Sequence, residues 1–149
     1  MISIEKTEDD AFILSCLTHP KIWPHVACDG IDSIAPPFVG VVFVEAKDED
    51  ERLGVYMLRA HNPALIEIHT ALLPIAWGRR AGEAAKALLA FLAGCGFRKA
   101  FTVVPQDNPA AYRYATRAGL RPEGILSKSY PKGGVLIDQH ILGIELCQQ

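Results

Sequence analysis

The stretch WGRRAGEAAKALLAFL, residues 77–92, decides the fold, because it joins the best helical pattern of the chain to a basic, glycine-containing start. Its alanines and leucines recur at the 3.6-residue spacing of one helix face. A glycine soon after Leu92 can end the helix. The segment therefore predicts an amphipathic helix that packs one face against the rest of the domain.

The start of this helix has two alternative interpretations. A helix N-terminus carries unpaired backbone N–H groups and a partial positive charge, so small residues and arginines there can hold a phosphate. Gly78 and Gly82, with Arg79 and Arg80 between them, fit that description. Taken alone, they fit equally well an ordinary tight turn followed by solvated arginines.

Runs of apolar residues on both sides of this helix predict a largely antiparallel sheet. The connections between the first strands are short, which favours a meander, and the helix would cross over between two parallel strands. We expect an α/β sandwich around this sheet, with about six to seven strands and about four helices. The expected strands are 1–5, 39–46, 53–60, 64–73, 99–105, about 120–130 and 134–146. The expected helices besides that of 77–92 are one that Thr7 caps and His19-Pro20 ends, and one at 108–119 with Asn108 as its cap.

Length and composition point to one small domain, residues 1–149. The formal net charge of −2 gives no sign of a nucleic-acid or membrane-surface binder. No apolar run approaches the ~18 residues of a membrane span, and the N-terminus lacks a signal core. The four cysteines are scattered, with no pattern of metal ligands, so we expect reduced thiols, a cytoplasmic protein and no metal.

Two motifs in this order resemble the GNAT superfamily of acetyl-CoA-dependent N-acyltransferases. The segment 79–84, RRAGEA, fits the superfamily's pyrophosphate loop as R-x-x-G-x-A, although a second register would begin the loop at Trp77. The segment 108–120, NPAAYRYATRAGL, is similar to a second motif of the superfamily. The resemblance covers roughly residues 37–146, and the run of residues 101–138 looks most like small phage and prophage members.

This resemblance implies that acetyl-CoA lies between the strands 64–73 and 99–105. Backbone near Leu72 and Pro74 would pair with the pantetheine arm, and Asn108 would touch it. The amides at the helix start would hold the pyrophosphate. The implied acetyl-CoA-binding residues are Leu72, Pro74, Trp77, Gly78, Arg79, Arg80, Ala81, Gly82, Ala84 and Asn108.

The resemblance also implies direct attack of an amine on the thioester, with a base to deprotonate the amine and an acid to protonate the thiolate. The superfamily's tyrosine acid falls at Ala115 here. Tyr112 shares a helix face with Asn108, whereas Tyr114 lies about 120° around the helix, so Tyr112 is the better hydroxyl on spacing. Both tyrosines also fit a packing role.

Strand alternation supplies two candidates for the base. Glu67 and His69 lie on one face of the expected strand 64–73, opposite Ile66 and Ile68. A histidine titrates near neutral pH, which suits a base. The alternative is that both side chains mark a solvated sheet face.

The sequence thus predicts an N-acetyltransferase that moves an acetyl group to an amine: a protein N-terminus, a lysine or a small amine. The alternatives are a GNAT-fold binding or assembly module without catalysis, and an unrelated α/β domain whose basic helix start binds another phosphate. Dimers are common in this superfamily, so a homodimer is left open.

Overall fold

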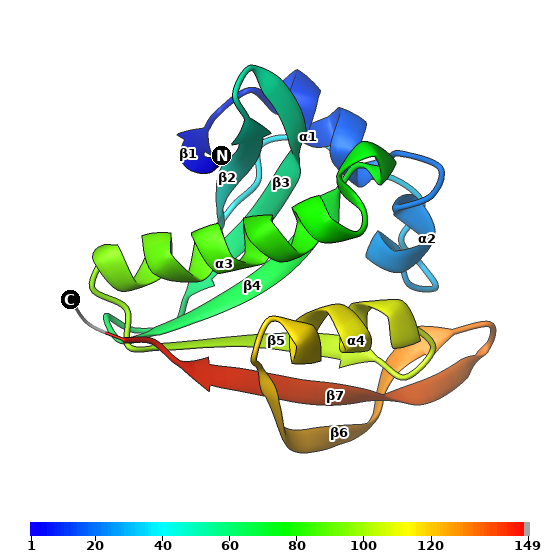
Figure 1. Cartoon of the computed structure of the whole chain (residues 1–149). Coiled ribbons are helices and arrows are strands. Elements are labelled where there is room, and N and C mark those ends of the chain that lie inside the picture. The colour runs from blue at the N-terminus through cyan, green and yellow to red at the C-terminus, as the bar shows by residue number, and fades with distance from the viewer. Residues whose placement is uncertain (148–149) are drawn as a thin grey trace.

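A computed structural model of the chain describes residues 1–147 and contains one mixed sheet with helices on both faces (Figure 1). The elements in chain order are β1 (Ile2–Thr7), α1 (Asp10–Leu17), α2 (Trp23–Val26), β2 (Val42–Asp48), β3 (Glu51–Ala60), β4 (Leu65–Leu72), the 3-10 turn η1 (Pro74–Ala76), α3 (Arg79–Gly94), β5 (Lys99–Pro105), α4 (Pro109–Arg117), β6 (Arg121–Lys132) and β7 (Val135–Glu145).

The seven strands form one sheet in the order β1-β2-β3-β4-β5-β7-β6. Every neighbouring pair is antiparallel except β4 and β5, which are parallel and are joined through α3. Short turns join β2 to β3, β3 to β4 and β6 to β7, whereas the parallel pair needs a long crossover. The expected mixed sheet with a single βαβ crossover is confirmed.

The pairing of β4 with β5 stops after three residues. Leu65, Ile66 and Glu67 pair with residues 99–101, and beyond them the two strands separate. Thr102 Oγ1 donates to the carbonyl of Ile68 at 2.8 Å, where the separation begins. Figure 1 shows β4 and β5 close together near the C-terminus and diverging toward the end at which α3 begins. The sheet is therefore split at the start of α3.

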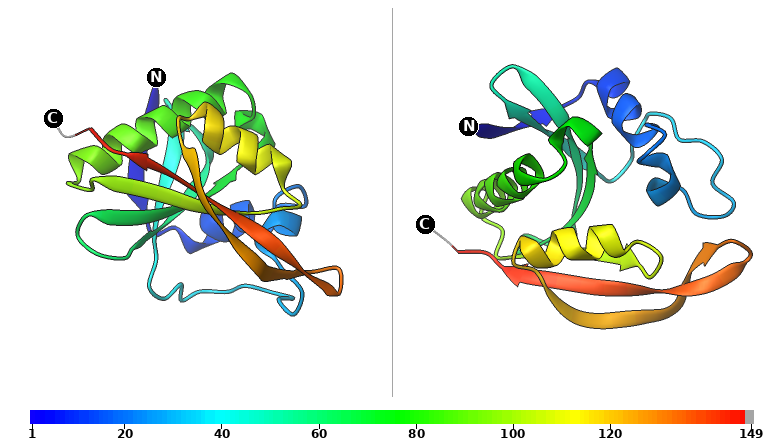
Figure 2. Two further views of the ribbon diagram at one scale, coloured as in Figure 1. Left: turned by 90° about the horizontal axis from the view of Figure 1, so that it is seen from below. Right: turned by 45° about the vertical axis from the view of Figure 1, so that its right-hand side comes forward.

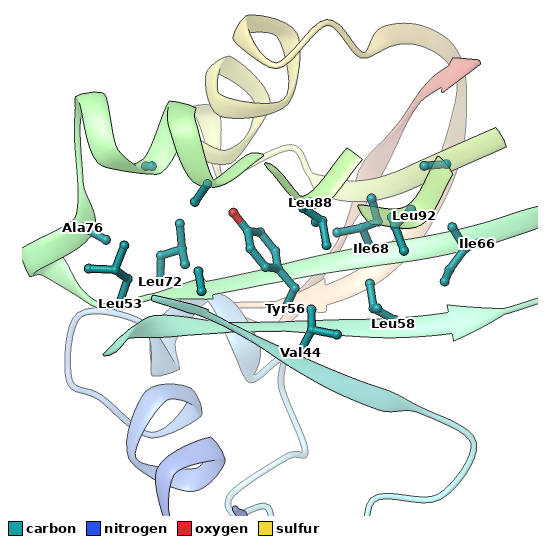
Figure 3. Close-up of a cluster of buried hydrophobic side chains, with 14 of the residues drawn as sticks. Val44, Leu53, Tyr56, Leu58, Ile66, Ile68, Leu72, Ala76, Leu88 and Leu92 are labelled. Atoms are coloured by element: carbon teal, nitrogen blue, oxygen red, sulfur yellow. The ribbon is translucent and has the colours of Figure 1, made fainter. Parts of the chain in front are cut away.

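The main core lies between α3 and the strands β2, β3 and β4. The apolar stripe of α3, which includes Leu88 and Leu92, packs on Ile66, Ile68 and Tyr56 (Figure 3). Burying these side chains supplies most of the driving force for folding. The predicted helical face is thus the one that faces the core.

A second cluster covers the opposite face of the sheet. Ile13, Cys16 and Leu17 of α1 pack there with Phe43 and Ala71. Two further views show α3 and α1 on opposite sides of the first four strands, with α4 over β5 and β7 (Figure 2). Ala71 and the core residue Leu72 thus point to opposite faces, as strand alternation predicts.

Gly54 allows β3 and β4 to approach closely at the end of this pair. It lies opposite Leu72 with a φ of +141°. A Cβ added there would lie 2.5 Å from the carbonyl oxygen of Ala71 and 2.6 Å from Leu72 Cα. Only glycine fits this position without movement of the backbone.

Several predicted boundaries are wrong by a few residues. The strand expected from residue 39 begins at Val42, because Gly40 has a φ of +78° and forms a turn. Asp9 caps α1 instead of Thr7: its carboxylate accepts from Phe12 N, and the Thr7 hydroxyl accepts from Asp9 N. None of the helices within residues 1–147 has both the length and the apolar character of a membrane span.

Candidate active site

A cavity of about 400 Å³ lies where β4 and β5 separate. Its walls come from α1 and α2, from β3, β4 and β5, from α3 and α4, and from the last two strands. Side chains far apart in sequence, such as His25, His69, Leu88, Ala115 and Tyr130, line it together. A mostly apolar cavity with a few polar groups is the usual form of a small-molecule site.

Glu67 and His69 are brought together on β4, at the end of its pairing with β5. The Nε2 atom of His69 makes a short hydrogen bond with one oxygen of Glu67, and His61 Nε2 lies 2.8 Å from the other. The His61 ring also packs on Phe101, with ring centroids 5.2 Å apart. The structure thus places a carboxylate between two imidazoles at the edge of the cavity.

In this trio, His69 is the member that lines the cavity, while Glu67 lies behind it. The hydrogen bond with His69, followed by that with His61, lowers the pKa of Glu67 to about 2, although partial burial opposes the shift. Glu67 is therefore a carboxylate over the whole physiological range and holds the His69 ring in place. Within residues 1–147, no group of three or more histidine, cysteine, aspartate or glutamate side chains is arranged to hold a metal ion.

The start of α3 has exposed backbone amides. Gly78 is its N-cap residue with a φ of +94°, and no side chain caps the helix there. The first amide that bonds back into the helix is that of Gly82, which donates to the carbonyl of Gly78 at 3.3 Å. A Cβ added at Gly78 or at Gly82 would meet no atom within 4 Å. The amides of residues 79–81 are therefore open to an approaching anion.

The two arginine side chains at this helix start are both engaged with carboxylates. Arg79 is largely exposed and pairs with Glu83 one turn along, at 2.8 Å. Arg80 bonds Glu51 and lies 3.4 Å from Asp48. The Arg80 guanidinium thus points toward the β2–β3 hairpin, so the open groups at this helix start are backbone amides.

Three predicted residues lie at the turn between β4 and α3. The Trp77 indole donates to the carbonyl of Leu72 at 2.9 Å, which ties the turn to the end of β4. Pro74 begins η1, and the 3-10 turn closes with Trp77 N bonded to its carbonyl at 3.1 Å. The Leu72 carbonyl, predicted to face pantetheine, therefore accepts from Trp77. Trp77 itself is half exposed.

The edge of β4 that faces β5 is open around Thr70. Leu73 N donates to Leu53 O at 2.8 Å, so the odd-numbered residues at this end of β4 bond to β3. Alternate residues direct their peptide groups to opposite edges, and Ile68 O indeed accepts from Thr102 on the β5 side. The peptide groups of Thr70 thus face the gap, where no strand of the described chain pairs with them.

On α4, Asn108 caps the helix as predicted: its side-chain oxygen accepts from Ala111 N at 3.2 Å. Asn108 also lines the main cavity. Tyr112 shares a side of α4 with Asn108, as the spacing predicts, but that side borders a separate depression in which the Tyr112 ring packs on His140. The structure does not bring Tyr112 together with Glu67 and His69.

Tyr114 is the tyrosine of α4 that reaches the main cavity, contrary to the preference for Tyr112. Its hydroxyl donates to the carbonyl of Ala81 at 2.9 Å and lies 2.7 Å from the Tyr56 hydroxyl. Burial raises the pKa of Tyr114 to about 12. Tyr114 thus links α4 to the first turn of α3. Ala84, also predicted to contact acetyl-CoA, is fully buried in the main core.

Sequence reasoning missed His61 and gave Tyr114 second place. His61 could have been found from the pairing of the β3–β4 hairpin. Arg59 lies opposite Glu67 there, and His61 follows two residues after Arg59. The rotation of α4 about its axis has no such signal, because packing against β5, β7 and Leu89 of α3 determines it.

Comparisons with known proteins bear on the fold. No protein-family model matches the sequence, and no curated protein matches it. Among solved structures, a probable GNAT-family acetyltransferase from Chromobacterium violaceum is similar with a TM-score of 0.75 and 21% identity, over 97% of this chain and 82% of that one. The spermidine N-acetyltransferase of Vibrio cholerae, in complex with CoA and spermine, is similar with a TM-score of 0.79 and 16% identity, over 97% and 95% of the two chains.

A third similar structure is the microcin C7 self-immunity acetyltransferase, solved with acetyl-CoA and AMP. It gives a TM-score of 0.62 and 22% identity, over 72% of this chain and 62% of that one. At 16–22% identity, these likenesses show the fold alone. The chain has the fold of the GNAT acetyltransferases.

Proposed function

We propose that this protein is an acetyl-CoA-dependent N-acetyltransferase that transfers the acetyl group to an amine. The observation that carries the proposal is the gap between β4 and β5. Three features lie around it: open backbone groups at Thr70, an uncapped helix start at Gly78 toward which the gap widens, and His69 on the cavity wall with Glu67 behind it. Each feature suits a different part of this reaction.

The binding of acetyl-CoA is assigned to the gap and to the start of α3. The peptide groups of Thr70 would pair with the pantetheine amides, as an added strand would. The amides of residues 79–81 would receive the pyrophosphate, and the exposed Arg79 adds positive charge beside them. The empty space next to Gly78 and Gly82 supports this assignment, because it lets a phosphate come close to the backbone.

The chemical step is assigned to the polar wall of the cavity. His69 would accept the proton that the amine loses, and Glu67 would orient the imidazole and stabilise its protonated form. The amine nitrogen forms the new bond to the acetyl carbon, and the C–S bond breaks with its electron pair leaving on sulfur. A thiolate with a conjugate-acid pKa of ~8.5 leaves readily and takes its proton from water. A dedicated acid at Ala115 is then unnecessary.

Tyr114 has a positioning role in this proposal. Its proton is directed at Ala81 O, and its oxygen accepts from Tyr56. This chain of hydrogen bonds fixes the first turn of α3 relative to α4 across the gap, so the amides that would hold the pyrophosphate keep their direction.

The proposal is tested by thermal unfolding with acetyl-CoA, CoA and ATP, followed by an assay of CoA release with a panel of amines. Selective stabilisation by the first two ligands, and amine-dependent CoA release, support the enzyme. Stabilisation without release for any amine would instead favour a binding module. No stabilisation at millimolar acetyl-CoA would overturn both.

A further inference from the structure

The walls of the cavity also indicate the chemical class of the acceptor amine. This inference rests on the proposed function. The part between α3 and α4 belongs to the acetyl-CoA side. The opposite part is formed by α1, α2, the segment after α2, β3 and the two last strands. Its side chains are Leu17, Ile22, Val26, Ile34, Met57 and Tyr130.

This acceptor side carries no formal charge. Among the described residues that line the cavity, none is an aspartate, glutamate, lysine or arginine. The other polar side chains on this part of the lining are Tyr130, Gln139 and His25, and the one carboxylate near them, that of Glu67, lies behind His69 in its hydrogen bond with that ring. A second ammonium group inside this space would have no counterion, and burying an unpaired charge is costly.

Charged residues near the cavity are used to build its wall. Both carboxylate oxygens of Asp29 accept backbone N–H groups of the β6–β7 turn, from Gly133 at 3.1 Å and from Gly134 at 2.8 Å. Lys132 Nζ donates to the carbonyls of Pro24 at 2.7 Å and Ala27 at 2.9 Å. These contacts join α2 to the β6–β7 hairpin across the cavity, so they close the wall and leave its inner surface apolar.

We propose that the acceptor is a primary amine on a small, uncharged, apolar body, such as an arylethylamine or a branched alkylamine. The amine nitrogen would lie at His69, and the body would pack on Met57, Val26 and Ile34. The cavity measures about 400 Å³ and also has to admit the thioester end of acetyl-CoA, which limits the size of the acceptor. Polyamines, which carry further ammonium groups, would be poor acceptors.

The test measures kcat/KM for CoA release with phenethylamine and isopentylamine against spermidine, in the full chain with saturating acetyl-CoA. We expect the apolar amines to be preferred at least about 10-fold, the scale that one uncompensated polar group imposes. Ile34→Glu should shift the preference toward spermidine, because it supplies a counterion on the cavity wall. Ile31→Glu is the matched control, since Ile31 lies in the same segment, is half exposed and does not line the cavity.

The outcomes separate the two proposals. If acetyl-CoA stabilises the protein and spermidine is preferred, or if neither apolar amine accelerates CoA release, the acceptor inference is overturned while acetyl-CoA binding stands. If acetyl-CoA gives no stabilisation, the proposed function fails first. Equal shifts in preference for Ile34→Glu and Ile31→Glu would show that surface charge, and not the cavity wall, sets the choice.

Discussion

Replacement of Gly82 by alanine should separate the stability of α3 from the proposed binding of acetyl-CoA at its start. Gly82 has helical backbone angles, and an added Cβ meets no atom within 4 Å, so the substitution causes no clash. Alanine is favoured over glycine in a helix by up to about 1 kcal/mol. For a chain of this size that gain raises Tm by roughly 2–4 °C in the absence of ligand.

The same methyl group would occupy the space through which the pyrophosphate approaches. Acetyl-CoA at a hundredfold excess over its Kd stabilises the native protein by about 2.7 kcal/mol. A tenfold weaker Kd at the same concentration leaves about 1.4 kcal/mol, so the ligand-induced rise in Tm should fall to about half. The variant is therefore more stable without ligand and less stabilised by it.

Gly94→Ala is the matched control, measured by thermal unfolding with and without acetyl-CoA. Gly94 is the last residue of the same helix, and a Cβ there also meets nothing within 4 Å. Its ligand-free Tm should rise, and its response to acetyl-CoA should stay that of the unaltered protein. An identical response to acetyl-CoA in the Gly82 and Gly94 variants would refute the placement of the pyrophosphate at the start of α3.

Three further perturbations address the proposed catalytic pair Glu67 and His69, the sheet, and the link between α3 and α4. Glu67→Gln should lower kcat at least about tenfold with little change in acetyl-CoA affinity, and a parallel loss of affinity would contradict its role behind His69. Because the pKa of Glu67 is lowered from 4.5 to about 2, its ionised form stabilises the fold above pH 4.5. In urea titrations, the unfolding free energy of the unaltered protein should exceed that of Glu67→Gln by less and less as pH falls from 4.5 toward 2. A difference that stays constant with pH would argue against the hydrogen bonds of Glu67 with His69 and His61. Gly54→Ala should cost about 1–3 kcal/mol of unfolding free energy, because its Cβ would press on backbone atoms of β4, and unchanged stability would refute that contact. Tyr56→Phe should cost about 1 kcal/mol in chemical denaturation by removing the hydrogen bond to Tyr114, and an unaltered midpoint would show that the bond contributes nothing net.

The order of strands and helices could be predicted from the sequence because local signals agree with the global fold. The apolar spacing of residues 77–92 predicted α3, and the short connections between apolar runs predicted the antiparallel strands β2, β3 and β4. Asn108 and Pro109 gave the start of α4, where the side chain of Asn108 caps the helix as the pattern requires. Alternation along β4 also placed Glu67 and His69 on one face, and the structure joins them by a hydrogen bond.

The remaining features of the site depend on contacts between distant segments. Arg80 looked like a phosphate ligand from its neighbours in sequence, yet Glu51 and Asp48 of a distant hairpin engage its guanidinium. Tyr112 looked better placed than Tyr114 because spacing fixes only relative angles on a helix. The packing of α4 sets the absolute direction, and it turns Tyr114 toward Ala81.

The central claim, that acetyl-CoA lies in the gap between β4 and β5, is tested most directly by following backbone amide resonances in NMR titrations with acetyl-CoA. We expect the largest shifts at Thr70 and at the amides of residues 79–81, with small changes in β1 and β2. Saturable binding whose largest shifts lie away from these amides, or no shifts at millimolar acetyl-CoA, would contradict it.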